Sequence, residues 1–379
     1  MSEKTKNVMS GGQAAAEAIK LCKPEVIPVY PITPQTPIVE SISQIVADGG
    51  LDAEIINVES EHSAMAAAIG AQATGVQAYT ATAGQGMALM HEMLFVASGM
   101  RLPIVMGVSN RTLSAPLNIW NDQQDSFSER DSGWIQLYVE NAQEVFDAHI
   151  QAFKIARETE TPVMVCMDGF IVSHTYEPIQ LLSEDAVRKF LPKHEAKVKL
   201  DPSAPVTMGP VATPEYFMRF KKQQQDALEE SKNVIKKINQ EFASISGRSY
   251  GNGLIEKINM ENKEHAIITI GSITGSAREI AEKLGVGIIR VRCLRPFPAE
   301  DLIEACKSLK SIGVLEKDIS LGANGALYDE IKSALYSLEN KPKISGYIIG
   351  LGGKPISIED ISSIIEKVKD GKEGSEWLM

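Results

Sequence analysis

Closely spaced cysteines are missing from this sequence. Only four cysteines occur, Cys22, Cys166, Cys293 and Cys306, and no two of them form a Cys-x-x-Cys pair. Iron–sulfur clusters and structural zinc ions are held by thiolates that lie close together. We therefore expect no iron–sulfur cluster and no other metal site on this chain. Scattered, unpaired cysteines are typical of a reducing compartment, which favours the cytoplasm.

Long apolar runs and an excess of positive charge are missing as well. No uninterrupted apolar run approaches the roughly 20 residues that a membrane-spanning helix needs, and the first residues, MSEKTKNVMSGG, lack the apolar core of a signal peptide. The net charge is −11, from 38 basic and 49 acidic residues. An acidic chain is a poor match for nucleic acids or anionic membranes, so we expect neither as a partner.

Alternating strand and helix patterns fill the first half of the 379 residues. Short apolar runs that read as strands are 26–29, 54–58, 77–82, 103–108 and 162–167. Segments with helical character are 13–21, 37–47, 61–75, 86–99 and 142–159. This alternation predicts an α/β fold with a mostly parallel sheet covered by helices.

The second half begins differently. Residues 171–212 contain five prolines and predict an extended segment over the first domain, whereas 214–245 predict a charged, solvated helix. A glycine-rich stretch at 247–253 precedes a second α/β unit, with strands at 266–270, 286–292 and 311–315 and helices at 275–284 and 299–308. We predict a first domain at 1–245 with an extension from about 171, a linker at 246–262 and a second domain at 263–379.

Side chains that could bind a ligand follow four of the predicted strands. Thr33 lies between two prolines, Glu61 begins an Ala-rich helix, a glycine loop spans 80–86, and Arg111 follows the strand at 103–108. Each has a simpler explanation: an ordinary turn, a helix cap, a generic glycine turn and a surface ion pair. Open α/β sheets bind ligands at the carboxyl ends of their strands, and there an arginine can bind a carboxylate and a glutamate can hold or share a proton.

Taken in order, several segments of the chain resemble the alpha subunit of pyruvate:ferredoxin oxidoreductases. They are YPITPQTPIVE, VESEHSAM, TATAGQGMALM, NRTLSAPLNIWNDQQDS, RDSGWIQ, CMDGF, LRPFP, SLGANGAL and GLGGKPIS, and they cover essentially the whole chain. VESEHSAM also resembles the segment of transketolase-like enzymes that contacts thiamine diphosphate. The resemblance implies a pyrimidine-binding-type parallel-sheet domain and a smaller α/β domain similar to the carboxyl-terminal domain of transketolase.

The resemblance also implies roles for particular residues. Glu61 would be the catalytic residue, hydrogen-bonded to N1′ of the cofactor's aminopyrimidine ring. Arg111 would bind the carboxylate of the 2-oxoacid, and Thr33 would donate a hydrogen bond to the substrate. The residues that would bind the cofactor are Tyr30, Pro31, Ile32, Glu61 and Gln85.

A division of labour between chains is implied too. The segment Met167-Asp168-Gly169 lacks the first glycine of the Gly-Asp-Gly sequence that anchors Mg²⁺ and diphosphate in this enzyme class. We therefore expect Asp168 to be structural and thiamine diphosphate to be shared with a beta subunit that holds Mg²⁺. Gamma and delta subunits would carry the iron–sulfur clusters, with pyruvate, coenzyme A and ferredoxin as reactants. The chain departs from the pattern of the family that it resembles at Gly84, where relatives often have serine.

Several alternatives stay open. The substrate could be a branched-chain 2-oxoacid, 2-oxoglutarate or oxalate, because Arg111 would recognise only the carboxylate. A non-catalytic assembly or ligand-binding subunit is a candidate of another class. A nicotinamide dehydrogenase is disfavoured, because the glycine loops at 271–275 and 322–325 do not match the Gly-x-Gly-x-x-Gly pattern.

Overall fold

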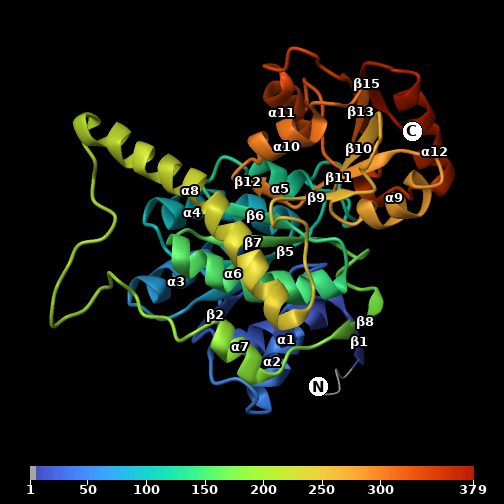
Figure 1. Cartoon of the computed structure of the whole chain (residues 1–379). Helices are drawn as coiled ribbons and strands as arrows, with labels where there is room; N and C mark the ends of the chain where they lie inside the picture. The colour runs from blue at the N-terminus through green and yellow to red at the C-terminus, as the bar shows by residue number, and fades with distance from the viewer. Residues whose placement is uncertain (1–5) are drawn as a thin grey trace.

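Two parallel-rich β-sheets organise the chain in the computed structural model, which describes residues 6–379 (Figure 1). The N-terminal segment for which we expected no signal peptide begins in residues 1–5, outside the described range. Within that range, no helix combines the length and the apolar character that crossing a membrane requires.

The first sheet has the strand order β12-β6-β7-β5-β4. Its strands are β4 (Tyr79–Thr82), β5 (Val105–Asn110), β6 (Ile135–Tyr138), β7 (Val163–Asp168) and β12 (Cys293–Arg295). All neighbours are parallel except β12 and β6. A parallel pair, β2 (Val26–Val29) and β3 (Glu54–Asn57), continues the sheet, because a bridge joins Val26 to Ala78 at the start of β4.

Helices cover both faces of this sheet. One apolar cluster packs residues of α1 (Gly11–Cys22), α2 (Thr36–Ala47), α6 (Ala142–Thr159) and α8 (Pro214–Ser246) against one face. A second cluster packs α3 (Glu61–Ala73) and α4 (Gly84–Gly99) against the other. The predicted alternation of strands and helices is confirmed for this part of the chain.

The segment 171–212 is less extended than we predicted. It contains β8 (Tyr176–Gln180), which pairs antiparallel with β1 (Lys6–Ser10), and the helix α7 (Glu184–Phe190). A strand is itself extended, so the prediction is wrong only at α7, a helix of seven residues that the sequence pattern did not reveal. The chain then leads into α8, whose N-terminal part projects from the body (Figure 1) with exposed Tyr216, Phe217, Met218 and Phe220.

The second sheet has the order β15-β14-β13-β10-β11-β9, and only β9 runs antiparallel to its neighbour. Its strands are β9 (Ile255–Ile258), β10 (His265–Ile270), β11 (Gly287–Val291), β13 (Ser311–Glu316), β14 (Lys343–Ile348) and β15 (Gly374–Trp377). Its helices are α9 (Ile273–Ala281), α10 (Ala299–Cys306), α11 (Ala326–Leu335) and α12 (Ile358–Lys369), and a 3₁₀ turn spans Leu351–Gly353. β9 lies inside the segment that we expected to be a linker, while the domain boundaries themselves stay predictions.

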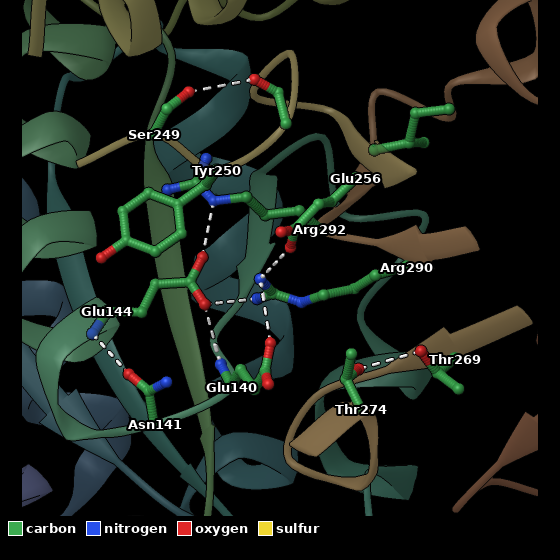
Figure 2. Close-up of polar contacts among 12 residues, drawn as sticks. Glu140, Asn141, Glu144, Ser249, Tyr250, Glu256, Thr269, Thr274, Arg290 and Arg292 are labelled. Carbon is green, nitrogen blue, oxygen red and sulfur yellow. Dashed lines mark hydrogen bonds and ion pairs between the residues drawn. The ribbon is translucent and has the colours of Figure 1, made fainter. Parts of the chain in front are cut away.

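Buried contacts join the two sheets. One apolar cluster runs from α3 and α4 under the first sheet to α10 and α11 under the second. Polar contacts add to it, because the fully buried Glu144 of α6 lies between Arg290 and Arg292, which flank the end of β11 (Figure 2). The four cysteines are all buried and unpaired.

Candidate functional site

The loops that follow β2, β3, β4 and β5 meet at the carboxyl ends of the strands. The Arg111 guanidinium donates to the Thr33 carbonyl (Nη1–O 3.0 Å), which joins the loop after β5 to the loop after β2. A Cβ atom on Gly84 would lie 2.9 Å from Arg111 Cδ, so the start of α4 packs directly on this side chain. The predicted convergence of the four segments is therefore present.

Glu61 is the first residue of α3, yet it does not cap that helix. The cap is Ser60, whose hydroxyl accepts from the Ser63 amide (3.2 Å). Glu61 is only 5% exposed, and within residues 6–379 its carboxylate receives no hydrogen bond and forms no ion pair. Ser60 and not Glu61 therefore makes the capping hydrogen bond; Glu61 is the acidic residue of the first turn, where the helix dipole favours it, and its oxygens stay available to a ligand.

Gly86 makes room for the Glu61 side chain. A Cβ atom there would lie 2.6 Å from Glu61 Oε1 and 2.5 Å from Thr82 Oγ1, so only glycine fits without a shift. The Thr82 hydroxyl is buried and has no hydrogen-bond partner in the described part of the chain. A buried polar group without a partner is costly, and here two such groups face the same point.

Arg111 is 8% exposed, and no carboxylate lies within ion-pair distance of it among the described residues. Besides the bond to Thr33, its Nε lies 3.4 Å from the Asn118 carbonyl. The alternative of a surface ion pair is therefore wrong. A guanidinium has five N–H donors, and the two carbonyls leave several of them free for a carboxylate ligand.

The remaining predicted residues line the same edge. Thr33 and Pro31 are exposed, Tyr30 and Ile32 are half-buried, and no hydrogen bond to the Thr33 hydroxyl is found in residues 6–379. Gln85 is half-buried at the start of α4, where its Nε2 lies 3.5 Å from the Thr112 carbonyl and its Oε1 is buried without a partner.

Asp125, on the short helix α5 (Gln124–Ser128), is a residue of this region that the sequence did not single out. Its fully buried carboxylate accepts from the backbone amides of Gly84 and Arg111 (both 2.9 Å). Burial raises the pKa of Asp125 to about 7, although hydrogen bonds from Asn110, Arg111 and Gly84 oppose that rise. One acidic residue in a polar segment carries no sequence signal that it is buried.

Asp168, at the end of β7, lies in a polar cluster between the two sheets. It is buried and accepts from Lys317 Nζ (2.9 Å), Gln123 Nε2 (2.9 Å) and the Ser272 amide (3.1 Å). Burial alone would raise its pKa, but the Lys317 charge and the hydrogen bonds hold the pKa of Asp168 below its usual range. These contacts agree with the structural role that we expected.

Two family models match this chain. The family described as "Pyruvate flavodoxin/ferredoxin oxidoreductase, thiamine diP-bdg" matches residues 17–240, and "Pyruvate:ferredoxin oxidoreductase core domain II" matches residues 263–361. The chain belongs to the pyruvate:ferredoxin oxidoreductase family. It is an oxidoreductase subunit, as the resemblance of its motifs implied.

Relatives support this membership along nearly the whole chain. The chain is 53% identical to the pyruvate synthase subunit PorA of Methanocaldococcus jannaschii, with 97% of this chain and 96% of that subunit covered. It is 44% identical to the ketoisovalerate oxidoreductase subunit VorA of Pyrococcus abyssi, with 96% and 93% covered.

Solved structures share the fold at low identity. A 2-oxoglutarate:ferredoxin oxidoreductase from Magnetococcus marinus, with 2-oxoglutarate, coenzyme A and succinyl-CoA bound, has a TM-score of 0.74 at 20% identity, covering 98% of this chain and 66% of that chain. A split-gene transketolase, an inactive beta4 tetramer, has a TM-score of 0.56 at 12% identity, covering 96% and 100%. The predicted α/β fold, with a pyrimidine-binding-type and a transketolase C-terminal-like part, is confirmed.

The side chains at this sheet edge are of types that fit thiamine diphosphate, the group named in the description of the matching family. An aminopyrimidine ring offers hydrogen-bond donors and acceptors, and within residues 6–379 the Glu61 carboxylate and the side-chain oxygens of Thr82 and Gln85 have no hydrogen-bond partner. Within residues 6–379 no three His, Cys, Asp or Glu side chains are placed to hold a metal ion.

Proposed function

We propose that this chain is the alpha subunit of a pyruvate:ferredoxin oxidoreductase and works only in a complex. The reaction is the coenzyme A-dependent oxidative decarboxylation of pyruvate to acetyl-CoA and carbon dioxide, with electrons passed to ferredoxin. The observation that carries the proposal is that one sheet edge holds a buried carboxylate, on Glu61, and a buried guanidinium, on Arg111, neither of which has a partner of opposite charge among residues 6–379. Family membership supports the same reading.

The roles of this chain's residues follow from their chemistry. Glu61 would form the hydrogen bond to N1′ of the aminopyrimidine when thiamine diphosphate is bound. Arg111 binds and orients the 2-oxoacid carboxylate, and Thr33, whose carbonyl already contacts Arg111, donates its hydroxyl to the substrate. Bound thiamine diphosphate supplies the electron sink for decarboxylation. Tyr30, Pro31, Ile32 and Gln85 line the cofactor.

Partner chains complete the site in this proposal. A beta subunit binds the diphosphate and Mg²⁺, and gamma and delta subunits carry the iron–sulfur clusters, in the cytoplasm. Support comes from the projecting part of α8, which exposes Tyr216, Phe217, Met218 and Phe220. Large exposed apolar groups that lie together mark surfaces which another protein covers.

A second substrate has specific support. The chain is 44% identical to a ketoisovalerate oxidoreductase subunit, and a guanidinium recognises the carboxylate that all 2-oxoacids share. A substrate screen with the purified complex decides between them: pyruvate is expected to give a higher kcat/KM than 2-oxoisovalerate, 2-oxoglutarate or oxalate.

The variant Glu61→Gln tests the proposed role of the carboxylate. It keeps the shape of the side chain but has neither the negative charge of the carboxylate nor its ability to accept a proton. We expect the reconstituted complex to assemble normally and to lose pyruvate-dependent ferredoxin reduction by about 100-fold or more. Glu59→Gln, at an exposed neighbour, is the matched control and is expected to keep its activity. Undiminished turnover of the Glu61 variant would sink the assignment.

A further inference from the structure

Asp125 connects two loops of the proposed site through one carboxylate. Oδ2 accepts from the amides of Gly84 and Arg111, both at 2.9 Å. Oδ1 accepts from Asn110 Nδ2 and from the Ser126 amide, both at 2.8 Å. The side chain is fully buried, so these four bonds are made out of contact with bulk water.

The two backbone amides on Oδ2 belong to the segments that carry the proposed ligand groups. Gly84 begins α4 and precedes Gln85, and Arg111 follows β5 directly. The loops also touch through side chains, because a Cβ atom on Gly84 would lie 2.9 to 3.3 Å from three carbons of Arg111. Gly84 has a φ of +49°, in the left-handed region that favours glycine.

We propose that Asp125 and Gly84 are positioning residues for substrate: together they set the place of the Arg111 guanidinium. Asp125 fixes the Arg111 backbone against the start of α4, and Gly84 leaves the space through which the Arg111 side chain reaches Thr33. Neither residue touches the substrate. This inference rests on the proposed function, because it presumes that Arg111 binds the 2-oxoacid carboxylate.

Asp125→Ala in the reconstituted complex tests the role of the carboxylate. It leaves the Gly84 and Arg111 amides without an acceptor, so Arg111 loses its fixed place. We expect KM for pyruvate to rise about tenfold or more, with kcat within about threefold of wild type. The Kd for thiamine diphosphate, measured by titration calorimetry with Mg²⁺, is expected to stay unchanged.

Asp125→Asn is expected to recover most of the loss. Its carbonyl oxygen can still accept from the Gly84 and Arg111 amides. Its NH₂ group takes the place of Oδ1, so the Ser126 amide loses its acceptor, but this NH₂ group can donate to Asn110 if the Asn110 side-chain amide turns over. The Asn110 side-chain amide can rotate because its Oδ1 is buried without a partner in the described chain and would gain one. A KM for this variant as high as that of Asp125→Ala counts against the hydrogen-bonding role.

Gly84→Ala tests the proposed role of Gly84 independently. It also tests whether the Arg111 guanidinium must be positioned if the Asp125 variants do not assemble. The added methyl group would displace Arg111, and KM is expected to rise in the same way. Gly49→Ala is its matched control, since Gly49 also has a positive φ (+73°) but nothing within 4 Å of the added Cβ. Asp147→Ala, at another buried carboxylate, controls for lost stability and is expected to lower Tm without changing KM.

Arg111→Ala separates the two levels of the proposal. If Arg111→Ala raises KM but Asp125→Ala and Gly84→Ala do not, the positioning role is wrong and the proposed function stands. If Arg111→Ala itself leaves KM unchanged, the proposed clamp is wrong. A higher KM in all three variants supports both the proposed carboxylate-binding role of Arg111 and the positioning role of Asp125 and Gly84.

Discussion

At the scale of single residues, what a side chain lacks is more informative here than what it contacts. Arg111 is almost fully buried, yet the hydrogen-bond acceptors of its guanidinium in the described chain are two carbonyl oxygens, of Thr33 and Asn118. A buried charge normally has a partner of opposite charge. A site that leaves this charge uncompensated in the free chain is suited to an anionic ligand.

Replacing Arg111 tests whether that ligand is the 2-oxoacid. Arg111→Ala is expected to raise KM for pyruvate by roughly 10- to 100-fold, the worth of about 1.5–3 kcal/mol for hydrogen bonds to a charged group. Arg111→Lys keeps the charge but not the forked geometry, so its KM is expected to be intermediate. Steady-state kinetics of the complex measure both. Arg101→Ala, which removes a side chain bound to the Thr159 and Glu160 carbonyls, is the control and should leave KM unchanged.

At the scale of elements, the junction of β13 and α11 shows how one carboxyl group replaces a helix cap. Glu316 ends β13 and accepts from the first amides of α11, at Leu327 (2.8 Å) and Tyr328 (3.1 Å). Burial raises the pKa of Glu316 to about 8, and the charge of Asp318 adds to that rise. At neutral pH the folded chain therefore keeps a proton here that the unfolded chain has released.

This difference makes a signed prediction about pH. Because the folded-state pKa lies above the unfolded value, the group's contribution to stability is complete below about pH 4.5 and is lost as the pH rises towards 8. The slope is at most about 1.4 kcal/mol per pH unit. Glu316→Gln carries no titrating group, so the stability of the variant relative to wild type is expected to increase from pH 5.5 to pH 8.

Denaturant unfolding at the two pH values measures the effect of Glu316→Gln. Glu40→Gln, at an exposed position, is the control and is expected to show no change with pH. A stability difference between the Glu316 variant and wild type that is the same at both pH values contradicts the assignment of the proton.

At the scale of the whole molecule, buried charges join the two sheets. Burial alone would raise the pKa of Glu144, but the charges of Arg290 and Arg292 hold it below its usual range. Arg290 also contacts Glu256 of β9, and Arg278 of α9 is paired with both Glu140 and Glu256. Figure 2 shows Glu144 beside Arg290 and Arg292, with Glu140 and Glu256 near Arg290. These ion pairs therefore link α6 and Glu140 of the first unit to β9, α9 and β11 of the second.

Neutralising Glu144 is expected to weaken that link. Glu144→Gln leaves the buried Arg292 guanidinium without a carboxylate partner in the described chain and Arg290 with only Glu140 and Glu256, which costs about 3–5 kcal/mol. The exposed pair of Lys237 and Glu158 provides the control: Glu158→Gln is expected to cost less than about 1 kcal/mol. The free energy of unfolding of both variants and of wild type is measured by guanidinium chloride denaturation. Equal decreases in the two variants would show that the network does not hold the sheets together.

Much of the fold was predictable because it is encoded locally. Apolar runs and helical periods located β2, β4, β5, β7, α2, α6 and α8 to within a few residues. The elements that we missed depend on distant partners or are very short. β12 has three residues and lies among the strands of the second unit in sequence, yet it pairs with β6 of the first sheet. β1 forms a strand only through its pairing with β8.

The sequence by itself determined the α/β order, the family and the candidate ligand groups, since these depend on local periodicity and on motifs. Only the tertiary structure decided which of those groups are free. Ser60 caps the helix and leaves the Glu61 carboxylate without a hydrogen bond, and no carboxylate lies within ion-pair distance of the Arg111 guanidinium within residues 6–379. It also revealed Asp125, because burial and hydrogen bonding depend on which segments meet in space, and sequence spacing does not record that.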